Sequence, residues 1–457
     1  MSDAQPSALD GRKVPRAVHH VLRTLDRAGH RSWIVGGAVR DLLLRRARRD
    51  PHEFDVATPA TPGEVQGLFE KVIPTGIEHG TVTVLEGRAR VEVTTFRGEG
   101  AYLDGRRPSS VSFHKDLTAD LARRDFTVNA LAWDPIEGEF RDPFEGLRDL
   151  RRRLIRAVGD PGERFAEDGL RPLRAVRFVA ELGFELERGT RGAIGPSLEV
   201  VERVSRERVA EELSRLVTGR FAEGGLRLLH ETGLLTAVLP ALSGLPPATV
   251  RHAVAVASDA CSPLRPSQAR GSADAERERC RLLRFAGLLH VLSAPVAMRS
   301  VVELRLPNRL AVGVADLVRA RGCLKEGGAP FPESPVEVRR WLSAAGPAVV
   351  GDLLELLAAD ARHQGRASRG LSEKVRRLGR RVRAELRRRP PLTVGDLALD
   401  GRAVMRILGV PGGPAVGEAI RHLLGLVLEL PGRNEPATLE SALRAWWADR
   451  PGGGPLR

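Results

Sequence analysis

Short apolar runs and turn residues alternate through residues 1–160, in a pattern typical of mixed strand and helix structure. Hydrophobic and polar residues alternate over 81–85 and again over 90–96, and the glycine-containing turn between these runs predicts a β-hairpin. Trp33-Ile34-Val35 is a shorter apolar run that ends in two glycines. The pattern over 126–133 fits a strand and a helix equally well. We therefore expect an α/β head.

From residue 163 almost to the end of the chain, apolar residues recur at three- and four-residue spacing, which predicts amphipathic helices. The predicted helical segments are 164–185, 206–218, 222–239, 281–292 and 335–361, then an arginine-dense helix at 376–391 and a compact tail from 397. The stretch 259–278 is polar and rich in Ser, Ala, Arg and Pro, which predicts a linker or a long exposed loop. The fold class is therefore α+β, with an all-α remainder after the head.

Net charge indicates more about the function of the chain than its length does. The 457 residues are enough for roughly two to four domains. Lys and Arg number 72 against 58 Asp and Glu, for a net charge of +14. Such a field attracts polyanions, nucleic acids among them. A compositional bias toward arginine would give the same excess, so charge alone leaves both interpretations open.

Cys261, Cys280 and Cys323 show no Cys-x-x-Cys spacing. We expect isolated thiols in a reducing compartment, and neither a disulfide nor a zinc framework. The first residues lack the apolar core of a signal peptide, and no run approaches the roughly 18 apolar residues of a membrane span. These features predict a cytoplasmic protein.

A glycine pair follows the first predicted strand, in Val35-Gly36-Gly37-Ala38-Val39-Arg40-Asp41. Glycine lets backbone amides approach a phosphate closely, and a helix that begins there turns its positive end toward the same group. Arg40 adds a guanidinium group for phosphate oxygens. The pattern favours phosphate binding, and the alternative is a simple tight turn.

Two acidic residues share one face of the next predicted strand. Glu53 and Asp55 flank a single residue, and alternate residues of a strand point the same way. Two carboxylates this close repel each other unless a cation lies between them, which suits Mg²⁺ bound to nucleotide phosphates. Glu92 faces away from its apolar neighbours Val91 and Val93. On an adjacent strand it would complete a three-carboxylate metal site, and the alternative is a solvated polar edge.

Arginines gather in two later segments, 123–130 and 167–178. On a helix, Asp168, Arg171 and Arg174 would be successive i,i+3 neighbours. An Asp acceptor beside Arg donors can imitate the edge of a complementary base. A solvated helix face with weak ion pairs is the alternative for this row, and a surface ion-pair patch is the alternative for the first segment.

Two histidines are further candidates. His79 lies in the predicted head, where it could contact substrate. His290 follows two leucines and lacks the acidic partner that a metal pair needs, so we expect a packed core histidine.

In this order the motifs resemble the class II tRNA nucleotidyltransferases, or CCA-adding enzymes, and their relatives the bacterial poly(A) polymerases. The resemblance covers much of the chain and is densest over 1–185. It rests on GGAVRD, EFDVAT, TGIEHGTVTV, VEVTTFR, YLDGRRPSSVSF, RRDFTVNAL and EDGLRPLRAVRFVAELGF. The last motif and the tail over 397–417 are closer to the CCA-adding version.

The resemblance implies a polymerase-β-like nucleotidyltransferase head with a mixed sheet at 1–160. A helical neck with a nucleotide-recognition helix would follow at 161–225, a helical body at 226–390 and an RNA-binding helical tail at 391–457. The segment 102–108 resembles the flexible loop associated with switching from C to A addition.

The resemblance also implies roles for single residues. Glu53 and Asp55 would hold Mg²⁺, with Glu92 as the accompanying catalytic acid. The residues that would contact the triphosphate are Gly37, Arg40 and Arg124. The residues that would read the base edge of CTP or ATP are Asp168 and Arg171, with Arg174 and Arg177 near the nucleotide.

Two positions depart from the family pattern. Glu53 stands where the family usually has Asp. Pro172 lies inside the expected recognition helix, and a proline there bends or restarts the helix unless it falls in the first turn.

The predicted function is therefore template-independent addition of CMP and AMP to the tRNA 3′ end, with Mg²⁺ as cofactor and release of pyrophosphate. The alternatives are a poly(A) polymerase acting on mRNA and an A-only tRNA nucleotidyltransferase. From a different class, the chain could be a non-catalytic RNA-binding protein.

Overall fold

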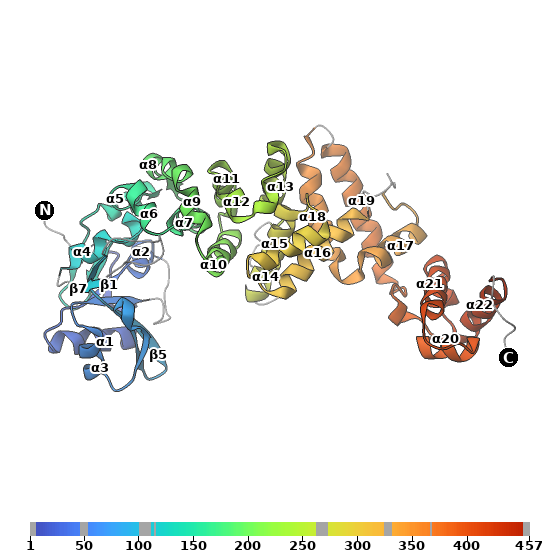
Figure 1. Ribbon diagram of the computed structural model, residues 1–457, viewed down its shortest axis with the longest axis horizontal. Helices are drawn as coiled ribbons and strands as arrows, with labels where there is room; N and C mark the ends of the chain where they lie inside the picture. The colour runs from blue at the N-terminus through green and yellow to red at the C-terminus, as the bar shows by residue number, and fades with distance from the viewer. Residues whose placement is uncertain are drawn as a thin grey trace. The chain divides into compact units, whose positions relative to one another are not determined.

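The computed structural model describes residues 6–45, 54–99, 111–113, 116–261, 273–323, 331–365 and 368–450. The chain divides into two compact units, 1–244 and 245–457 (Figure 1). Among the described residues all strands lie in the first unit, and the second unit is helical.

A seven-stranded sheet forms the centre of the first unit, in the order β3-β4-β5-β2-β1-β8-β9. The pair β2 and β5 runs parallel and the pair β1 and β2 antiparallel, so the sheet is mixed, as predicted. Two smaller sheets pair β6 with β7 and β10 with β11. The strands are β1 (Trp33–Val35), β2 (Asp55–Thr58), β3 (Val72–Gly76), β4 (Thr81–Glu86), β5 (Ala89–Thr95), β6 (Arg97–Glu99), β7 (Val111–Phe113), β8 (Ala132–Asp134), β9 (Glu139–Arg141), β10 (Leu154–Ile155) and β11 (Glu185–Leu186).

The local patterns explain these strands. The predicted hairpin is β4 and β5, whose register pairs Leu85 with Arg90. The ambiguous stretch 126–133 resolves into a 3-10 helix at Thr127–Asn129 and the start of β8. Every residue of β1 is buried, because helices and neighbouring strands cover it.

Helices surround the sheet and then continue beyond it in the first unit (Figure 1). They are α1 (Arg16–Arg27), α2 (Gly37–Leu43), α3 (Pro62–Leu68), α4 (Leu117–Ala122), α5 (Gly146–Arg152), α6 (Pro161–Glu167), α7 (Arg171–Leu182), α8 (Arg188–Gly192), α9 (Leu198–Glu202), α10 (Arg206–Val217), α11 (Ala222–Glu231) and α12 (Leu234–Val238). Helix α7 packs against α10 and α11. The approach of α11 is close: a Cβ at Gly225 would lie 2.6 Å from the Cβ of Ala180.

The predicted helix 164–185 is two helices, α6 and α7, separated at Asp168–Leu170. Pro172 falls in the first turn of α7, where its missing amide costs nothing. The expectation that Asp168 shares a helix face with Arg171 is therefore wrong, since Asp168 has an extended backbone that precedes the helix.

The second unit consists of α13 (Pro247–Asp259), α14 (Ala273–Leu289), α15 (Ala294–Glu303), α16 (Asn308–Gly322), α17 (Pro335–Ala345), α18 (Val350–Arg362), α19 (Ser368–Arg387), α20 (Gly401–Leu408), α21 (Pro414–Glu429) and α22 (Pro436–Ala448). The predicted helix 335–361 is broken at Gly346, which has a φ of 94° and precedes a proline. The predicted loop 259–278 is helical from Ala273, because α14 begins earlier than its apolar pattern.

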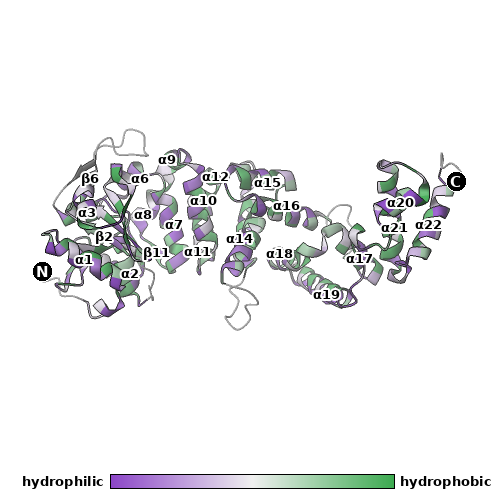
Figure 2. Cartoon of the chain, turned by 90° about the horizontal axis from the view of Figure 1, so that it is seen from below, coloured by the Kyte–Doolittle hydropathy of each residue, from purple (hydrophilic) through white to green (hydrophobic). Residues whose placement is uncertain are grey.

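Amphipathic packing holds this unit together. Figure 2 shows hydrophilic and hydrophobic residues side by side along α19, whose Val375, Leu378 and Val382 enter the core. Buried Arg339 donates from Nε to the Leu428 carbonyl at 2.6 Å and from Nη1 to Glu385 at 2.6 Å, and so ties α17 to α19 and α21.

The prediction of isolated thiols is wrong for two of the cysteines. Cys261 and Cys280 form a disulfide across the α13–α14 pair, with Cα atoms 5.4 Å apart. Cys323 is free. Among the described residues no single helix is long and apolar enough to cross a membrane, although the bent pair 335–345 and 347–362 passes on length and composition.

Candidate active site

A polar pocket of about 450 Å³ opens in the first unit between the β1–α2 turn and the N-terminal half of α7. Its lining residues are Gly36, Gly37, Ala38, Arg40, Asp55, Arg123, Arg124, Asp125, Asn129, Asp168, Arg171, Arg174, Arg177, Phe178 and Arg215. Among these described lining residues, seven are arginines and three are aspartates. The excess of positive charge suits a polyanionic ligand such as a triphosphate.

The β1–α2 turn requires glycine at position 36. Gly36 has φ 71° and ψ −133°, a combination that side chains rarely allow. A Cβ at this position would lie 2.9 Å from Nη1 of Arg124 and 3.9 Å from Oδ2 of Asp55. The turn therefore brings a bare backbone, a guanidinium group and a carboxylate together.

Asp55 begins β2, and Glu92 is its direct partner in the parallel pairing with β5. Paired residues of neighbouring strands project from the same face of the sheet. Both side chains are exposed, while the next residue of each strand, Val56 and Val93, is buried. The two carboxylates therefore occupy one face, as expected. Glu53, the third predicted acid, lies outside the described residues.

The two arginines of the RRDF motif, Arg123 and Arg124, form ion pairs with one carboxylate. Asp120 of α4 accepts from Nη2 of Arg123 at 2.7 Å and from Nη2 of Arg124 at 3.2 Å. Burial alone would raise the pKa of Asp120, but the two guanidinium groups outweigh it and lower the pKa. Arg124 is thus fixed above the glycine turn.

Asp125 joins the two sides of the pocket. Its Oδ2 accepts from Nε and Nη2 of Arg174 at 2.9 and 2.6 Å, and its Oδ1 accepts from Nδ2 of Asn129 at 2.9 Å. Oδ1 of Asn129 accepts from Nη1 of Arg40 at 2.5 Å. Burial of Asp125 opposes ionisation, but the charge of Arg174 and the hydrogen bonds lower its pKa to about 2. This network connects α2 to α7.

The start of α7 presents an acceptor beside donors. Oδ1 of Asp168 accepts from the Leu170 amide at 3.0 Å, and Oδ2 accepts from Arg208 at 2.8 Å. Arg171 donates from Nη2 to the Arg123 carbonyl at 3.0 Å and forms an ion pair with Glu167. Both side chains therefore have fixed orientations in the pocket.

Arg177 is the most deeply buried of the predicted residues. Only 1% of its side chain is exposed, and it donates to Glu212 of α10 and, at 2.5 Å, to Glu181. Its guanidinium carbon lies 3.9 Å from the centroid of the Phe178 ring. Arg177 thus supports the pocket wall that Phe178 forms.

The structure brings together most of the predicted site. The predicted residues that line the pocket are Gly37, Arg40, Asp55, Arg124, Asp168, Arg171, Arg174 and Arg177. Glu92 pairs with Asp55 in the sheet but does not line the pocket. The loop at 102–108 and the side chain of His79 lie outside the described structure. Asp125 and Asn129 have no role predicted from the sequence, although both belong to the RRDFTVNAL motif that carried the resemblance.

Comparisons with known proteins agree with this geometry. Residues 32–156 match the family model described as poly A polymerase head domain. Residues 183–245 match the model described as a probable RNA and SrmB-binding site of polymerase A. The mixed sheet, the glycine turn and the acid pair define the head as that of a polymerase-β-like nucleotidyltransferase.

Proteins that are similar over nearly the whole chain identify the family within this class. The CCA-adding enzymes of Geobacillus thermodenitrificans (strain NG80-2) and Geobacillus stearothermophilus are each 36% identical over 430 residues, which cover 94% of this chain and 96% of the relative. The crystal structure of the Bacillus stearothermophilus CCA-adding enzyme in complex with CTP matches with 33% identity and a TM-score of 0.69, over 94% of this chain and 97% of the other. The chain belongs to the family of CCA-adding enzymes.

A more distant structure shares the fold alone. The Thermotoga maritima CCA-adding enzyme complexed with tRNA is 19% identical, with a TM-score of 0.63 over 96% of this chain and 97% of the other.

Proposed function

We propose that this protein adds CMP and AMP to the 3′ end of tRNA without a nucleic-acid template and releases pyrophosphate. The observation that carries the proposal is the network through Asp125, which fixes Arg174 of α7 relative to the glycine turn. A nucleotide whose triphosphate lies at the turn would thus meet a rigid set of donors and acceptors for its base. The relatives that span nearly the whole chain are CCA-adding enzymes, which favours tRNA over mRNA as the acceptor.

The start of α7 explains why C and A would be chosen. Cytosine and adenine both present an amino donor beside a ring nitrogen acceptor, whereas guanine and uracil present a carbonyl oxygen in place of that amino group. The Asp168 carboxylate would accept from the amino group, and the guanidinium group of Arg171 would donate to the ring nitrogen. A carbonyl oxygen would face the Asp168 carboxylate and be repelled. Arg174 and Arg177 would keep this wall in place.

The phosphate end would lie at the β1–α2 turn. The amide of Gly37 and the guanidinium groups of Arg40 and Arg124 would bind the triphosphate. The 3′ hydroxyl of the RNA would form a bond to the α-phosphorus while the bond to pyrophosphate breaks, with no covalent enzyme intermediate. The same guanidinium groups would stabilise the charge that develops on the leaving pyrophosphate.

Asp55 and Glu92 project from one sheet face, where their carboxylate oxygens could share a divalent cation, and the sequence predicts Glu53 as a further ligand. Their hard oxygen ligands favour Mg²⁺. When bound, the ion would activate the RNA hydroxyl and neutralise phosphate charge.

The remaining assignments stay predictions. We assign 1–160 to the catalytic head, 161–225 to the neck, 226–390 to the body and 391–457 to an RNA-binding tail. We place the reaction in the cytoplasm.

Incubation of the protein with Mg²⁺, each labelled nucleoside triphosphate in turn and a tRNA that ends at the discriminator base tests the proposal. Two CMP residues followed by one AMP residue are expected. Long A tails would favour a poly(A) polymerase, and addition of A only to a tRNA ending in CC would favour an A-only enzyme. Binding without incorporation would refute a transferase.

A further inference from the structure

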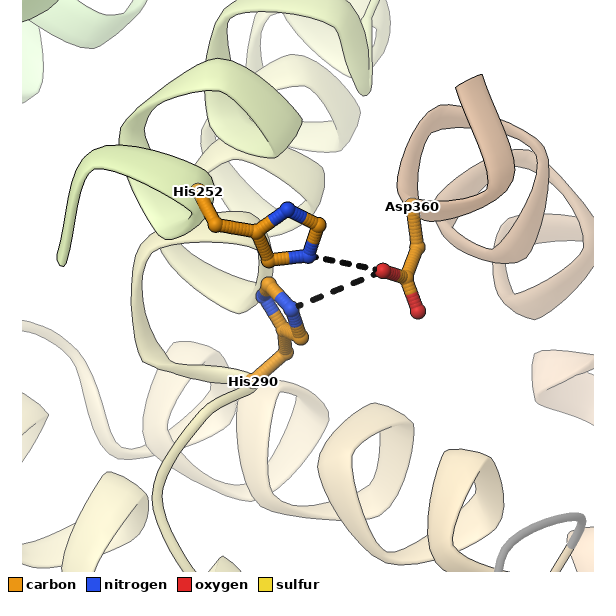
Figure 3. Close-up of side chains that lie close together, drawn as sticks. All are labelled: His252, His290 and Asp360. Atoms are coloured by element: carbon orange, nitrogen blue, oxygen red, sulfur yellow. Dashed lines mark hydrogen bonds and ion pairs between the residues drawn. The ribbon is translucent and has the colours of Figure 1, made fainter. Parts of the chain in front are cut away.

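Two histidines and an aspartate from three different helical segments meet inside the second unit (Figure 3). His252 belongs to α13, His290 directly follows α14, and Asp360 belongs to α18. One potential ligand atom from each lies within 4.8 Å of the others. Nε2 of His252 is 2.9 Å from Oδ1 of Asp360, and Nε2 of His290 is 4.0 Å from the same oxygen. The expectation that His290 has no acidic partner is wrong, because the partner is distant in sequence.

The hydrogen bonding of His290 fixes which nitrogen carries the proton. Nδ1 lies 2.7 Å from the carbonyl oxygen of Gly287, which can only accept, so Nδ1 must be protonated. In the neutral ring, Nε2 then carries a lone pair. Only 1% of this side chain is exposed, and Nε2 has no hydrogen-bond partner among the described residues.

Nε2 of His290 lies 4.0 Å from Oδ1 of Asp360, which is also an acceptor. Two acceptors that face each other in a buried place are unfavourable unless a cation or a donor lies between them. The arrangement therefore calls for a third species between the two lone pairs.

Asp360 is held so that one oxygen is directed at the histidines. Arg321 donates to Oδ2 from Nε and Nη2 at 3.0 and 2.6 Å. Gln364 donates to Oδ1 at 2.7 Å. These bonds hold the carboxylate so that Oδ1 faces the two histidines as an oriented ligand.

We propose that His252, His290 and Asp360 bind a divalent transition-metal ion of the Zn²⁺ type. Two imidazole nitrogens and one carboxylate oxygen form a donor set that Zn²⁺ accepts, with a water in the fourth position. Zinc-binding histidines usually donate their other N–H to a carbonyl or carboxylate oxygen, as His290 does to Gly287.

The spacing of the three side chains also fits. Tetrahedral zinc with ligands at about 2.0–2.1 Å places the ligand atoms about 3.3 Å apart. The observed separations of 2.9 and 4.0 Å lie on either side of that value. On binding, His252 would exchange its hydrogen bond to Asp360 for the metal and move its proton to Nδ1. Because nitrogen ligands disfavour Mg²⁺, this site differs in chemistry from the acid pair of the first unit.

Cobalt provides a direct probe, since Co²⁺ takes tetrahedral nitrogen and oxygen sites and absorbs visible light there. The full-length protein is treated with EDTA, dialysed and titrated with Co²⁺. Visible bands that saturate at one equivalent are expected for the wild type and for Asp55→Ala, which removes a ligand of the head. The bands should be lost in His290→Gln and in His252→Gln, and Zn²⁺ should displace the Co²⁺ signal.

Protein stability provides a second test of the same site that does not depend on light absorption by the metal. At a free Zn²⁺ concentration about 100 times Kd, the unfolding equilibrium constant of the wild type should fall about 100-fold, and that of His290→Gln should not change. His252→Gln, whose position is half-buried, should fold normally and keep wild-type nucleotide incorporation in Mg²⁺.

Three results would overturn the proposal. The first is the absence of Co²⁺ bands in the wild type, which would mean that a water bridges His290 and Asp360. The second is retention of the bands in both histidine variants. The third is their loss in Asp55→Ala, which would place the bound cobalt in the head.

Discussion

Gly36→Ala is the substitution whose cost the structure defines best. The Gly36 amide donates to the Leu131 carbonyl at 3.1 Å, and the Gly36 carbonyl accepts from the Arg40 amide at 3.2 Å. The backbone therefore cannot leave its φ of 71° without losing these bonds. A non-glycine residue in such a conformation costs roughly 1–3 kcal/mol. The contact of the new Cβ with Arg124 adds little, because the end of a flexible side chain can move.

That movement has its own consequence for function. Arg124 would leave the place that Asp120 gives it above the turn, so the KM for CTP should rise together with the loss of stability. Urea unfolding and steady-state incorporation measure the two effects. Gly63→Ala in α3 is the matched control, because nothing lies within 4 Å of its Cβ position, and it should be neutral or slightly stabilising. A Gly36→Ala protein with wild-type stability and KM would refute the account of the turn.

Three further predictions concern charged groups. Asp125→Asn should lower kcat/KM for CTP roughly 10- to 100-fold, because it weakens charge-assisted bonds to Arg174 worth about 1.5–3 kcal/mol, and unchanged kinetics would contradict the network. Arg208→Met should raise misincorporation of UMP and GMP relative to CMP, because one oxygen of Asp168 loses its hydrogen-bond partner. Unaltered selectivity in single-nucleotide assays would argue against base recognition by Asp168. Burial lowers the pKa of His290 from 6.5 to about 4, so the unfolded state takes up the proton first as the pH falls. In EDTA, protonation of His290 should therefore remove roughly 2 kcal/mol of unfolding free energy between about pH 7 and 5. His290→Asn should lose less than the wild type over this range, and equal losses in urea titrations would contradict this.

Local pattern predicted the glycine turn and the shared sheet face of Asp55 and Glu92, while Glu53 lies outside the described residues. Two glycines after an apolar run predicted the β1–α2 turn. The alternation of Glu92 with Val91 and Val93 predicted that its side chain lies on the sheet face opposite to theirs. In the structure Glu92 pairs directly with Asp55, and the next residue of each strand, Val56 and Val93, is buried. The side-chain periodicity of a strand is what predicts the sheet face on which a residue lies.

The connections between distant segments were not predictable in this way. Spacing predicted that Asp168 continues a helical row, but α6 ends at Glu167 and α7 begins at Arg171, so Asp168 precedes the helix. Glu212 supports Arg177 from α10, and no sequence spacing relates them. The meeting of His252 with Asp360 and the disulfide of Cys261 likewise depend on how whole helices pack.

The most direct test of the catalytic assignment is single-turnover incorporation of labelled CMP by Asp55→Ala, with tRNA binding measured on the same protein. If the carboxylates on β2 and β5 hold the catalytic ion, the rate should fall at least about 1000-fold, since a metal contributes several kcal/mol of transition-state stabilisation. The affinity for tRNA should stay within about twofold of the wild type, because Asp55 makes no predicted contact with RNA. A variant that binds tRNA and still incorporates CMP at the wild-type rate would contradict the assignment.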